Sequence, residues 1–154
     1  ELEHSKLEDV VRDKAKQIAK VIKGPFIVDD AGIFFESYPN FPGTFTKYVF
    51  RSLGYAGILK LLKNKNREAY FKTVVAYRKN NGRILLFKGI CKGVISYKPR
   101  GSLKPLSPFN RLFIPLGNKK TFSEMTLEEQ SIFSHRAKAL GKLADYLRRR
   151  SNEK

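Results

Sequence analysis

The sequence predicts an α/β fold with a mixed sheet and flanking helices. Apolar residues recur at a spacing of three to four in residues 5–22 and again after Ser134, which is typical of amphipathic helices. β-branched and aromatic residues dominate residues 67–97, which is typical of strands. The two kinds of segment alternate along 154 residues, enough for a single domain, 1–154, with its own core.

The N-terminal part predicts a helix followed by a strand. Residues 5–22 form the helix, and Ser5 is its expected N-cap. The continuous apolar run 25–28 predicts a strand buried on both faces. Asp29 and Asp30 are expected where this strand leaves the sheet, a common address for ligands in α/β proteins.

The central part predicts helices and then a hairpin. Residues 44–63 are expected to form two short helices broken near Gly54. Antiparallel strands are expected near 67–78 and 83–97, because the Asn-Gly pair at 81–82 is a strong hairpin turn signal.

The C-terminal part predicts a loop, a short strand and two helices. Prolines and a glycine make 98–110 a loop, and 111–115 a strand. Thr126 and Glu129 form a capping box for a short helix, and Ser134 begins a longer one. The expected apolar face of that helix is Ala137, Leu140, Leu143, Ala144 and Leu147.

The composition is strongly basic, with 31 Lys+Arg against 14 Asp+Glu and a formal net charge of +17. Such a surface attracts phosphates of nucleic acid, nucleotides or acidic lipids, but it also serves as solubility and ion-pair surface. The basic stretches 60–67 and 147–150, with Tyr70, Phe71 and Tyr77 as stacking faces, leave nucleic acid open as a partner. The same aromatic residues fit equally a sheet interior.

The single cysteine, Cys91, leaves no internal disulfide and fits a reducing compartment. No apolar stretch approaches the ~20 residues that span a bilayer, and residues 1–20 are too charged for a signal peptide. We therefore expect a cytoplasmic protein without a membrane partner.

Two short motifs carry chemistry. Asp29 and Asp30, if they share a site, can hold Mg²⁺ and accept a proton from an attacking water, although such a pair also serves as a turn or cap. The Ser134-His135-Arg136 motif at a helix start favours an anionic or carbonyl-bearing ligand, such as a purine O6, and is also compatible with an ordinary capped helix.

Several blocks together resemble the inosine triphosphate pyrophosphatase family over residues 1 to about 147. They are VDDAGIFF, NFPGTFTKYV, GILKLL, REAYFKTVVAY, FKGICKG, FIP and KTFSEMTLEEQSIFSHRAKAL, in the family's order and spacing. The resemblance implies an elongated, two-lobed α/β fold, a homodimer, and a purine nucleoside triphosphate bound between the lobes. It also implies Mg²⁺-dependent hydrolysis of ITP, dITP or XTP to the monophosphate and pyrophosphate.

The resemblance also implies roles for single residues. Asp30 corresponds to the water-activating base, Asp29 lies near the metal, and Glu1 looks like an upstream metal-binding glutamate. His135 and Arg136 match residues that read the purine edge.

The sequence departs from the family pattern at substrate contacts. No Thr/Ser-x-Asn-x-x-Lys phosphate-binding motif precedes Glu1, so the chain is expected to be N-terminally truncated relative to the family. The base-binding loop is altered, with Phe109 left to stack and Asn110 in place of an aspartate, and Gln130 stands where a lysine is expected. We expect altered base selectivity. A non-catalytic relative that binds nucleotides, RNA or a protein is therefore the alternative to an enzyme.

Overall fold

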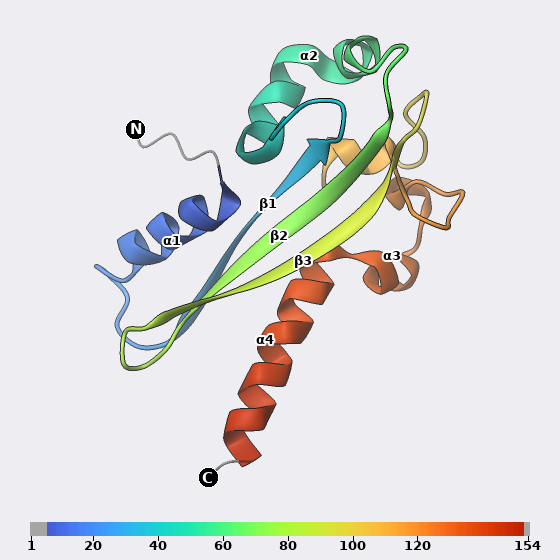
Figure 1. The fold of residues 1–154 in the computed structure, drawn as a ribbon. Coiled ribbons are helices and arrows are strands. Elements are labelled where there is room, and N and C mark those ends of the chain that lie inside the picture. The colour runs from blue at the N-terminus through green and yellow to red at the C-terminus, as the bar shows by residue number, and fades with distance from the viewer. Residues whose placement is uncertain (1–5, 153–154) are drawn as a thin grey trace.

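The computed structural model describes residues 6–152 and confirms the α/β class, with a four-stranded sheet flanked by helices (Figure 1). The strands are β1 Phe26–Phe35, β2 Glu68–Arg78, β3 Ile84–Ile95 and β4 Phe113–Pro115. The α-helices are α1 Leu7–Ile18, α2 Thr46–Leu61, α3 Leu127–Phe133 and α4 His135–Asn152. Three short 3-10 helices occupy Gly43–Phe45, Pro108–Arg111 and Phe122–Glu124.

The strand order is β1-β2-β3-β4, and each pairing is antiparallel. Within residues 6–152 the sheet is thus antiparallel rather than mixed, because each strand pairs with its successor in the chain and runs back along it. The hairpin between β2 and β3 is as expected: Arg78 pairs with Ile84, and Gly82 takes φ +84° in the turn.

The first strand continues past the point where the sequence predicted its end. Asp29 and Asp30 lie inside β1, opposite Val75 and Val74 of β2. The run 25–28 is not buried on both faces, since the Ile27 side chain is 56% exposed. The reason is that β1 is the outermost strand of the sheet formed by the described residues.

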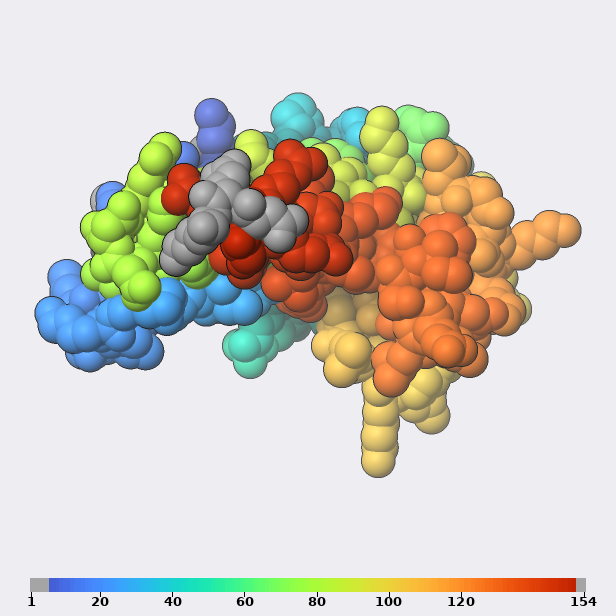
Figure 2. All heavy atoms as spheres, turned by 90° about the horizontal axis from the view of Figure 1, so that it is seen from below, coloured from blue at the N-terminus to red at the C-terminus, as the bar shows by residue number. Residues whose placement is uncertain are grey.

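The two faces of the sheet carry different helices. Strand residues alternate between faces, so the even-numbered residues of β2 face α1 and the odd-numbered residues face α4. On the α1 side the buried contacts are Leu7, Val11, Ala15, Phe34, Val74 and Ala76. On the α4 side they are Val75, Ala139 and Leu143. Figure 2, seen from below, shows the C-terminal part of α4 (red) at the surface that faces the viewer.

Helix α1 is shorter than predicted. It ends at Ile18 rather than at residue 22, and Ile22 is 47% exposed in the connection to β1. Its expected N-cap, Ser5, lies outside the described residues.

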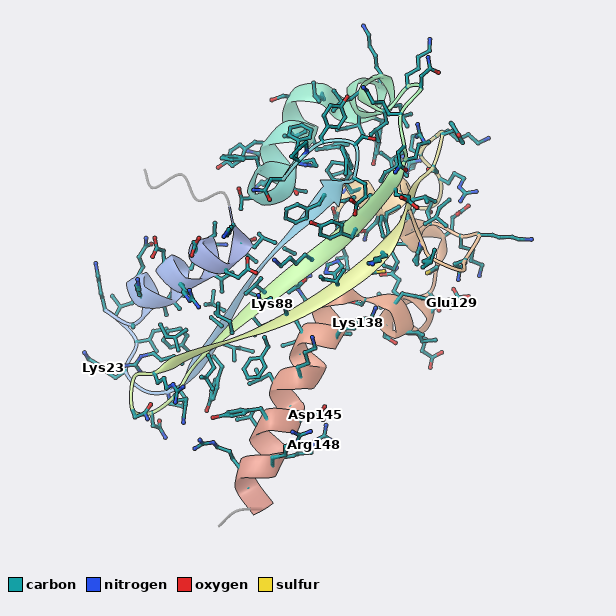
Figure 3. The ribbon with its side chains drawn as sticks, in the orientation of Figure 1. Lys23, Lys88, Glu129, Lys138, Asp145 and Arg148 are labelled. Carbon is teal, nitrogen blue, oxygen red and sulfur yellow. The ribbon has the colours of Figure 1, made fainter. Side chains whose placement is uncertain are left out.

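Helix α4 begins after Ser134, as expected, but its buried face differs from the predicted one. Ala139 and Leu143 are buried, whereas Leu140 and Leu147 are 38% and 41% exposed. The backbone of α4 lies directly on β3 at Gly89, where a Cβ would lie 1.9 Å from the backbone oxygen of His135. Beside this contact the Lys138 ammonium (Figure 3) donates to the carbonyl of Ile90 at 2.9 Å. The contact at Gly89 decides which residues face the sheet, and apolar residues elsewhere on the helix are left at the surface.

The helix break and the aromatic residues follow the sequence. Gly54 interrupts α2 with φ 59° and ψ −172°. Phe71 is buried, Tyr70 stacks on Phe34, and Tyr77 contacts Tyr146, so these rings belong to the sheet interior. They do not form an open surface for stacking bases.

Candidate functional site

A pocket of about 300 Å³ lies between β1, the loop around residues 106–110 and the start of α4. This volume is at the lower end of the range for small-molecule sites. The pocket gathers most of the predicted site residues: Asp30, Asn110, Gln130, Ser134, His135 and Arg136. Asp29 and Phe109 do not line it, and Glu1 lies outside the described residues.

Asp29 and Asp30 do not face a common point. As consecutive strand residues they project to opposite faces of the sheet. The Lys14 ammonium of α1 donates to Oδ2 of Asp30 at 2.8 Å. Arg136 Nε of α4 donates to Oδ2 of Asp29 at 2.7 Å. Each carboxylate is therefore neutralised by a cation from a different helix.

Lys14 does not line the pocket, but it is the ion-pair partner of Asp30 and the sequence analysis did not identify it. The spacing of residues along the helix could have indicated it, because Lys14 lies two turns after the buried Leu7 and one turn after the buried Val11. This places it beside the buried face of α1, over the edge of β1. The Lys14 side chain is 44% exposed, so the ammonium can also reach an anionic ligand at Asp30.

His135 is held on the sheet by two contacts. Its ring stacks on Phe71, with centroids 4.8 Å apart and an interplanar angle of 23°. Its Nδ1 lies 2.5 Å from Oγ1 of Thr73, a fully buried residue of β2. Burial, reinforced by the charges of Arg136 and Lys138, lowers the pKa of His135 to about 4. The imidazole is therefore neutral at physiological pH.

The neighbours of His135 complete the start of α4. Ser134 caps the helix, since its Oγ accepts the N–H of Ala137 at 3.2 Å. Arg136 lines the pocket and is bound to Asp29 by one of its nitrogens. Donor groups of a helix N-terminus and a guanidinium thus line the pocket together with Asp30 of β1.

Gln130 has a structural role in the pocket wall. Its Nε2 donates to the carbonyls of Phe122 at 2.8 Å and Met125 at 3.2 Å. The predicted capping box of Thr126 and Glu129 is confirmed at the start of α3.

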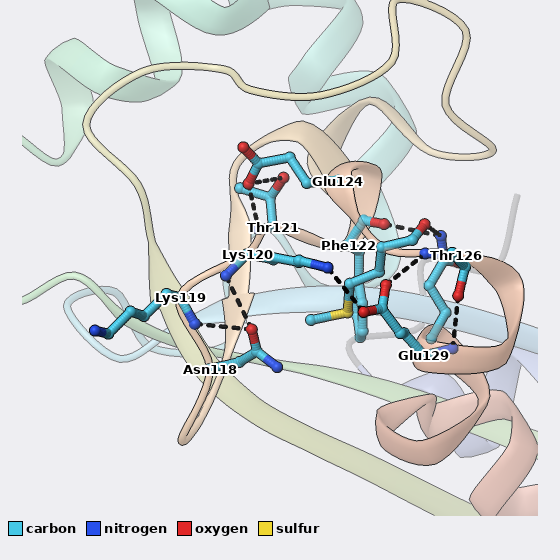
Figure 4. Close-up of polar contacts among 10 residues, drawn as sticks. Asn118, Lys119, Lys120, Thr121, Phe122, Glu124, Thr126 and Glu129 are labelled. Carbon is cyan, nitrogen blue, oxygen red and sulfur yellow. Dashed lines mark hydrogen bonds and ion pairs between the residues drawn. The ribbon is translucent and has the colours of Figure 1, made fainter.

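A second capping box, Thr121 with Glu124, directly precedes it. Lys120 links the two segments by an ion pair to Glu129 at 2.8 Å (Figure 4). These contacts fix the segment from which Phe122 and Gln130 line the pocket.

Phe109 is placed differently from the expectation. It is 1% exposed and makes edge contacts with Phe35 and Phe50 in the aromatic core. Its ring is therefore not open to stack on a base. Asn110, the next residue, does line the pocket.

Gly32 brings β1 against the loop that precedes α2. A Cβ at Gly32 would lie 2.3 Å from the carbonyl oxygen of Gly43. Thr46 bridges the two segments, donating to that carbonyl at 2.7 Å and accepting the N–H of Ile33 at 3.0 Å. Only a residue without a side chain fits here, and the contact fixes the pocket wall beside Asp30.

The described residues include a suitable ligand type for a divalent cation, a carboxylate, but they do not provide a complete set of ligands. Nowhere between residues 6 and 152 do three His, Cys, Asp or Glu side chains gather. Asp30 is the acidic residue among those that line the pocket. One carboxylate is nevertheless compatible with Mg²⁺, which commonly takes its other ligands from water and substrate phosphates.

The fold and the pocket together define an α/β protein with a candidate ligand site between β1 and the start of α4. The sequence pattern of the Ham1 family matches residues 1–146. The chain belongs to this family, and the resemblance inferred from the sequence is confirmed. Within the described residues, no helix is long and apolar enough to cross a membrane.

Relatives and solved structures agree with this assignment. The chain is 44% identical to the dITP/XTP pyrophosphatase of Thermococcus kodakarensis, over 96% of this chain and 79% of that protein. It is 43% identical to the dITP/XTP pyrophosphatase of Saccharolobus solfataricus, over 96% and 76%. A HAM1 protein from Coxiella burnetii superposes with a TM-score of 0.81 at 26% identity, covering 97% of this chain and 80% of that one.

Proposed function

We propose that the chain hydrolyses deaminated purine nucleoside triphosphates, ITP, dITP and XTP, to the monophosphate and pyrophosphate. The supporting observation is the pocket, which joins Asp30 of β1 to the Ser134-His135-Arg136 motif of α4. An acid at one side and carbonyl-reading donors at the other suit a substrate with a phosphate chain and a 6-oxo base. The names of the relatives support the same substrate class.

Asp30 acts as the base in this proposal. A water attacks the α-phosphorus and its proton passes to Asp30, while the bond from that phosphorus to the oxygen bridging the α- and β-phosphates breaks and pyrophosphate leaves with the bridging oxygen. Lys14, which contacts Asp30, neutralises charge on the phosphate chain when the nucleotide binds.

Mg²⁺ is the proposed cofactor. Asp30 would hold it together with phosphate oxygens of the substrate. Bound there, the ion would neutralise charge on those oxygens. Glu1 stays a predicted further ligand, and the predicted metal role of Asp29 competes with its ion pair to Arg136. The homodimer and the cytoplasmic location likewise stay proposals.

The test is pyrophosphate release from ITP, XTP, dITP, ATP and GTP with Mg²⁺. We expect release that favours the deaminated purines in the native chain and a loss of release in Asp30→Asn. Circular dichroism of both proteins verifies that the variant folds. Equal release by the two proteins would contradict the role of Asp30, and no release from any of the five would contradict the proposed activity.

The second candidate function is nucleic-acid binding, and one observation favours it. Lys60, Lys63 and Lys65 line a second hollow of about 450 Å³ together with Tyr97, which is 83% exposed. The guanidinium of Arg67 lies 4.3 Å from the centre of the Tyr97 ring. Cations beside an open aromatic ring suit a single-stranded polynucleotide. This function predicts that the affinity for polynucleotide falls steeply as the salt concentration rises. It also predicts that Asp30→Asn leaves that affinity unchanged.

A further inference from the structure

We propose that Thr73 is a positioning residue that fixes His135 as the tautomer with its proton on Nε2, so that the pocket offers a donor to 6-oxo purines and rejects 6-amino purines. The inference deepens the proposed function, because it names the group that sets base preference at the same site. Its basis is one hydrogen bond and the packing that enforces it.

The hydrogen-bonding needs of Thr73 determine the direction of the bond. Thr73 Oγ1 lies 2.5 Å from Nδ1 of His135, and the residue is 0% exposed. A buried hydroxyl must place its proton on an acceptor. Among the described residues, Nδ1 of His135 is the hydrogen-bond partner of Thr73 Oγ1. The hydroxyl is therefore satisfied as a donor only when Nδ1 carries a lone pair.

Packing around the His135 imidazole keeps the ring in the orientation that makes the hydrogen bond to Thr73. Gly89 is the cross-strand partner of Thr73, and a Cβ there would lie 1.9 Å from the backbone oxygen of His135 and 2.7 Å from the nitrogen of Ala139. The first turns of α4 thus rest directly on the sheet beside Thr73. The Phe71 ring supports one face of the imidazole. The hydrogen bond and the stacking together leave the imidazole a single orientation.

The free nitrogen of the ring is consequently a donor. His135 lines the pocket, and with Nδ1 engaged by Thr73, Nε2 is the ring nitrogen available to a ligand. The ring is neutral at physiological pH, because its pKa is lowered to about 4, so a single proton is shared between the two nitrogens. A lone pair on Nδ1 therefore means a proton on Nε2.

This donor distinguishes purines at position 6. An N–H group can donate to the carbonyl oxygen of hypoxanthine, xanthine or guanine. It meets another donor in the amino group of adenine, and the mismatch leaves both groups unpaired in the pocket. The Nε2–H donor of His135 therefore discriminates between ITP and ATP but not between ITP and GTP.

The test uses Thr73→Val, which keeps the shape and removes the hydroxyl, and Thr73→Ser, which keeps the hydroxyl. The sequence has two histidines, His4 and His135, so a His4→Gln background leaves one imidazole to observe. Long-range ¹⁵N–¹H NMR at pH 7 reports the protonated nitrogen. We expect an unprotonated Nδ1 in the native protein and in Thr73→Ser, and a mixture of tautomers in Thr73→Val. A proton on Nδ1 in the native protein, or an unchanged ring in Thr73→Val, would overturn the inference.

Base preference is measured in parallel through the dissociation constants of inosine and adenosine monophosphate. We expect Thr73→Val to lower the preference for the inosine nucleotide roughly tenfold and Thr73→Ser to retain it. An unchanged ratio in Thr73→Val would overturn the role in specificity. Neither readout requires turnover. If no triphosphate is hydrolysed but the tautomer and the ratio change as expected, the inference stands and the proposed hydrolysis fails.

Discussion

Asp29 and Asp30 are neighbours in the chain but belong to opposite sides of the sheet, one bound to Arg136 of α4 and the other to Lys14 of α1. The alternation of a β-strand separates them, and the two helices take one carboxylate each. A pair of aspartates that suggests one shared metal site in the sequence is therefore divided into two ion pairs with different surroundings.

Neutralising the two carboxylates should have different kinetic effects. Asp30→Asn should lower kcat for ITP by about 10²–10⁴-fold, as expected for loss of a general base. Asp29→Asn should raise KM roughly tenfold through the released Arg136, with less effect on kcat. Steady-state kinetics over a Mg²⁺ series measures both. A shifted Mg²⁺ requirement in Asp29→Asn would instead assign that carboxylate to the metal.

Lys14 should matter for binding the phosphate chain. Lys14→Met keeps the length of the side chain and removes its charge, so we expect KM for ITP to rise roughly tenfold while kcat changes less. The matched control is Lys20→Met, whose side chain is exposed beyond the end of α1. Equal KM values for the two variants would show that Lys14 contributes only general charge.

A second ion-pair group on the α1 face should make stability depend on pH. The Glu8 carboxylate is 17% exposed and lies 2.7 Å from the ammonium of Lys72 and 3.0 Å from that of Lys88. Burial alone would raise the pKa of Glu8, but the hydrogen bonds from Lys72 and Lys88 outweigh it and lower the pKa from 4.5 to about 2. The ionised form is thus favoured in the folded protein.

Glu8→Gln should therefore lower the free energy of unfolding at pH 7 by about 2 kcal/mol. Because the folded-state pKa of Glu8 is below the unfolded value, the contribution is complete above pH 4.5 and is lost as the pH falls towards 2. Urea denaturation at pH 7 and pH 3 should show a smaller difference between native and variant proteins at pH 3. Glu128→Gln, at an exposed position of α3, serves as the control that should change neither value.

Two glycines near α4 give opposite predictions. Gly89→Ala places a methyl group against the backbone of His135 and should lower the free energy of unfolding by about 2–3 kcal/mol and reduce turnover of ITP. Gly141 lies within α4, and a Cβ there meets nothing within 4 Å. Gly141→Ala should raise the free energy of unfolding by up to about 1 kcal/mol, the helix-propensity difference. Thermal denaturation in which the melting temperatures of both variants shift in the same direction would contradict these two predictions.

Features set by local chemistry could be predicted from the sequence. The Asn-Gly turn at 81–82 fixed the hairpin register, Gly54 marked the break in α2, and Thr126 with Glu129 marked the start of α3. Each depends on backbone conformation or hydrogen bonds within a few residues. The place of the Ser134-His135-Arg136 motif at a helix start was likewise predicted, and all three residues line the pocket.

Features set by distant contacts could not be predicted. Lys14 meets Asp30 only because α1 packs over β1, and the hydrogen bond of Thr73 to His135 joins residues 62 positions apart. The buried face of α4 follows from its contact with Gly89 rather than from the distribution of its leucines. Thr73 did offer a signal, as a small polar residue between Phe71 and Val75 in the every-second-residue pattern of one strand face.

Among the strands of residues 6–152, β1 lies at an outer edge of the sheet, and this position has a consequence for solubility. Ile27 leaves apolar surface at this edge, and an exposed edge strand is a template on which another chain can add by backbone pairing. Asp29 and Asp30, with their two cationic partners, place four charges in the middle of that strand. Desolvating them would oppose the growth of an intermolecular sheet. We therefore expect the two aspartates also to protect the protein against aggregation, and replacing both at once should shorten its life in concentrated solution.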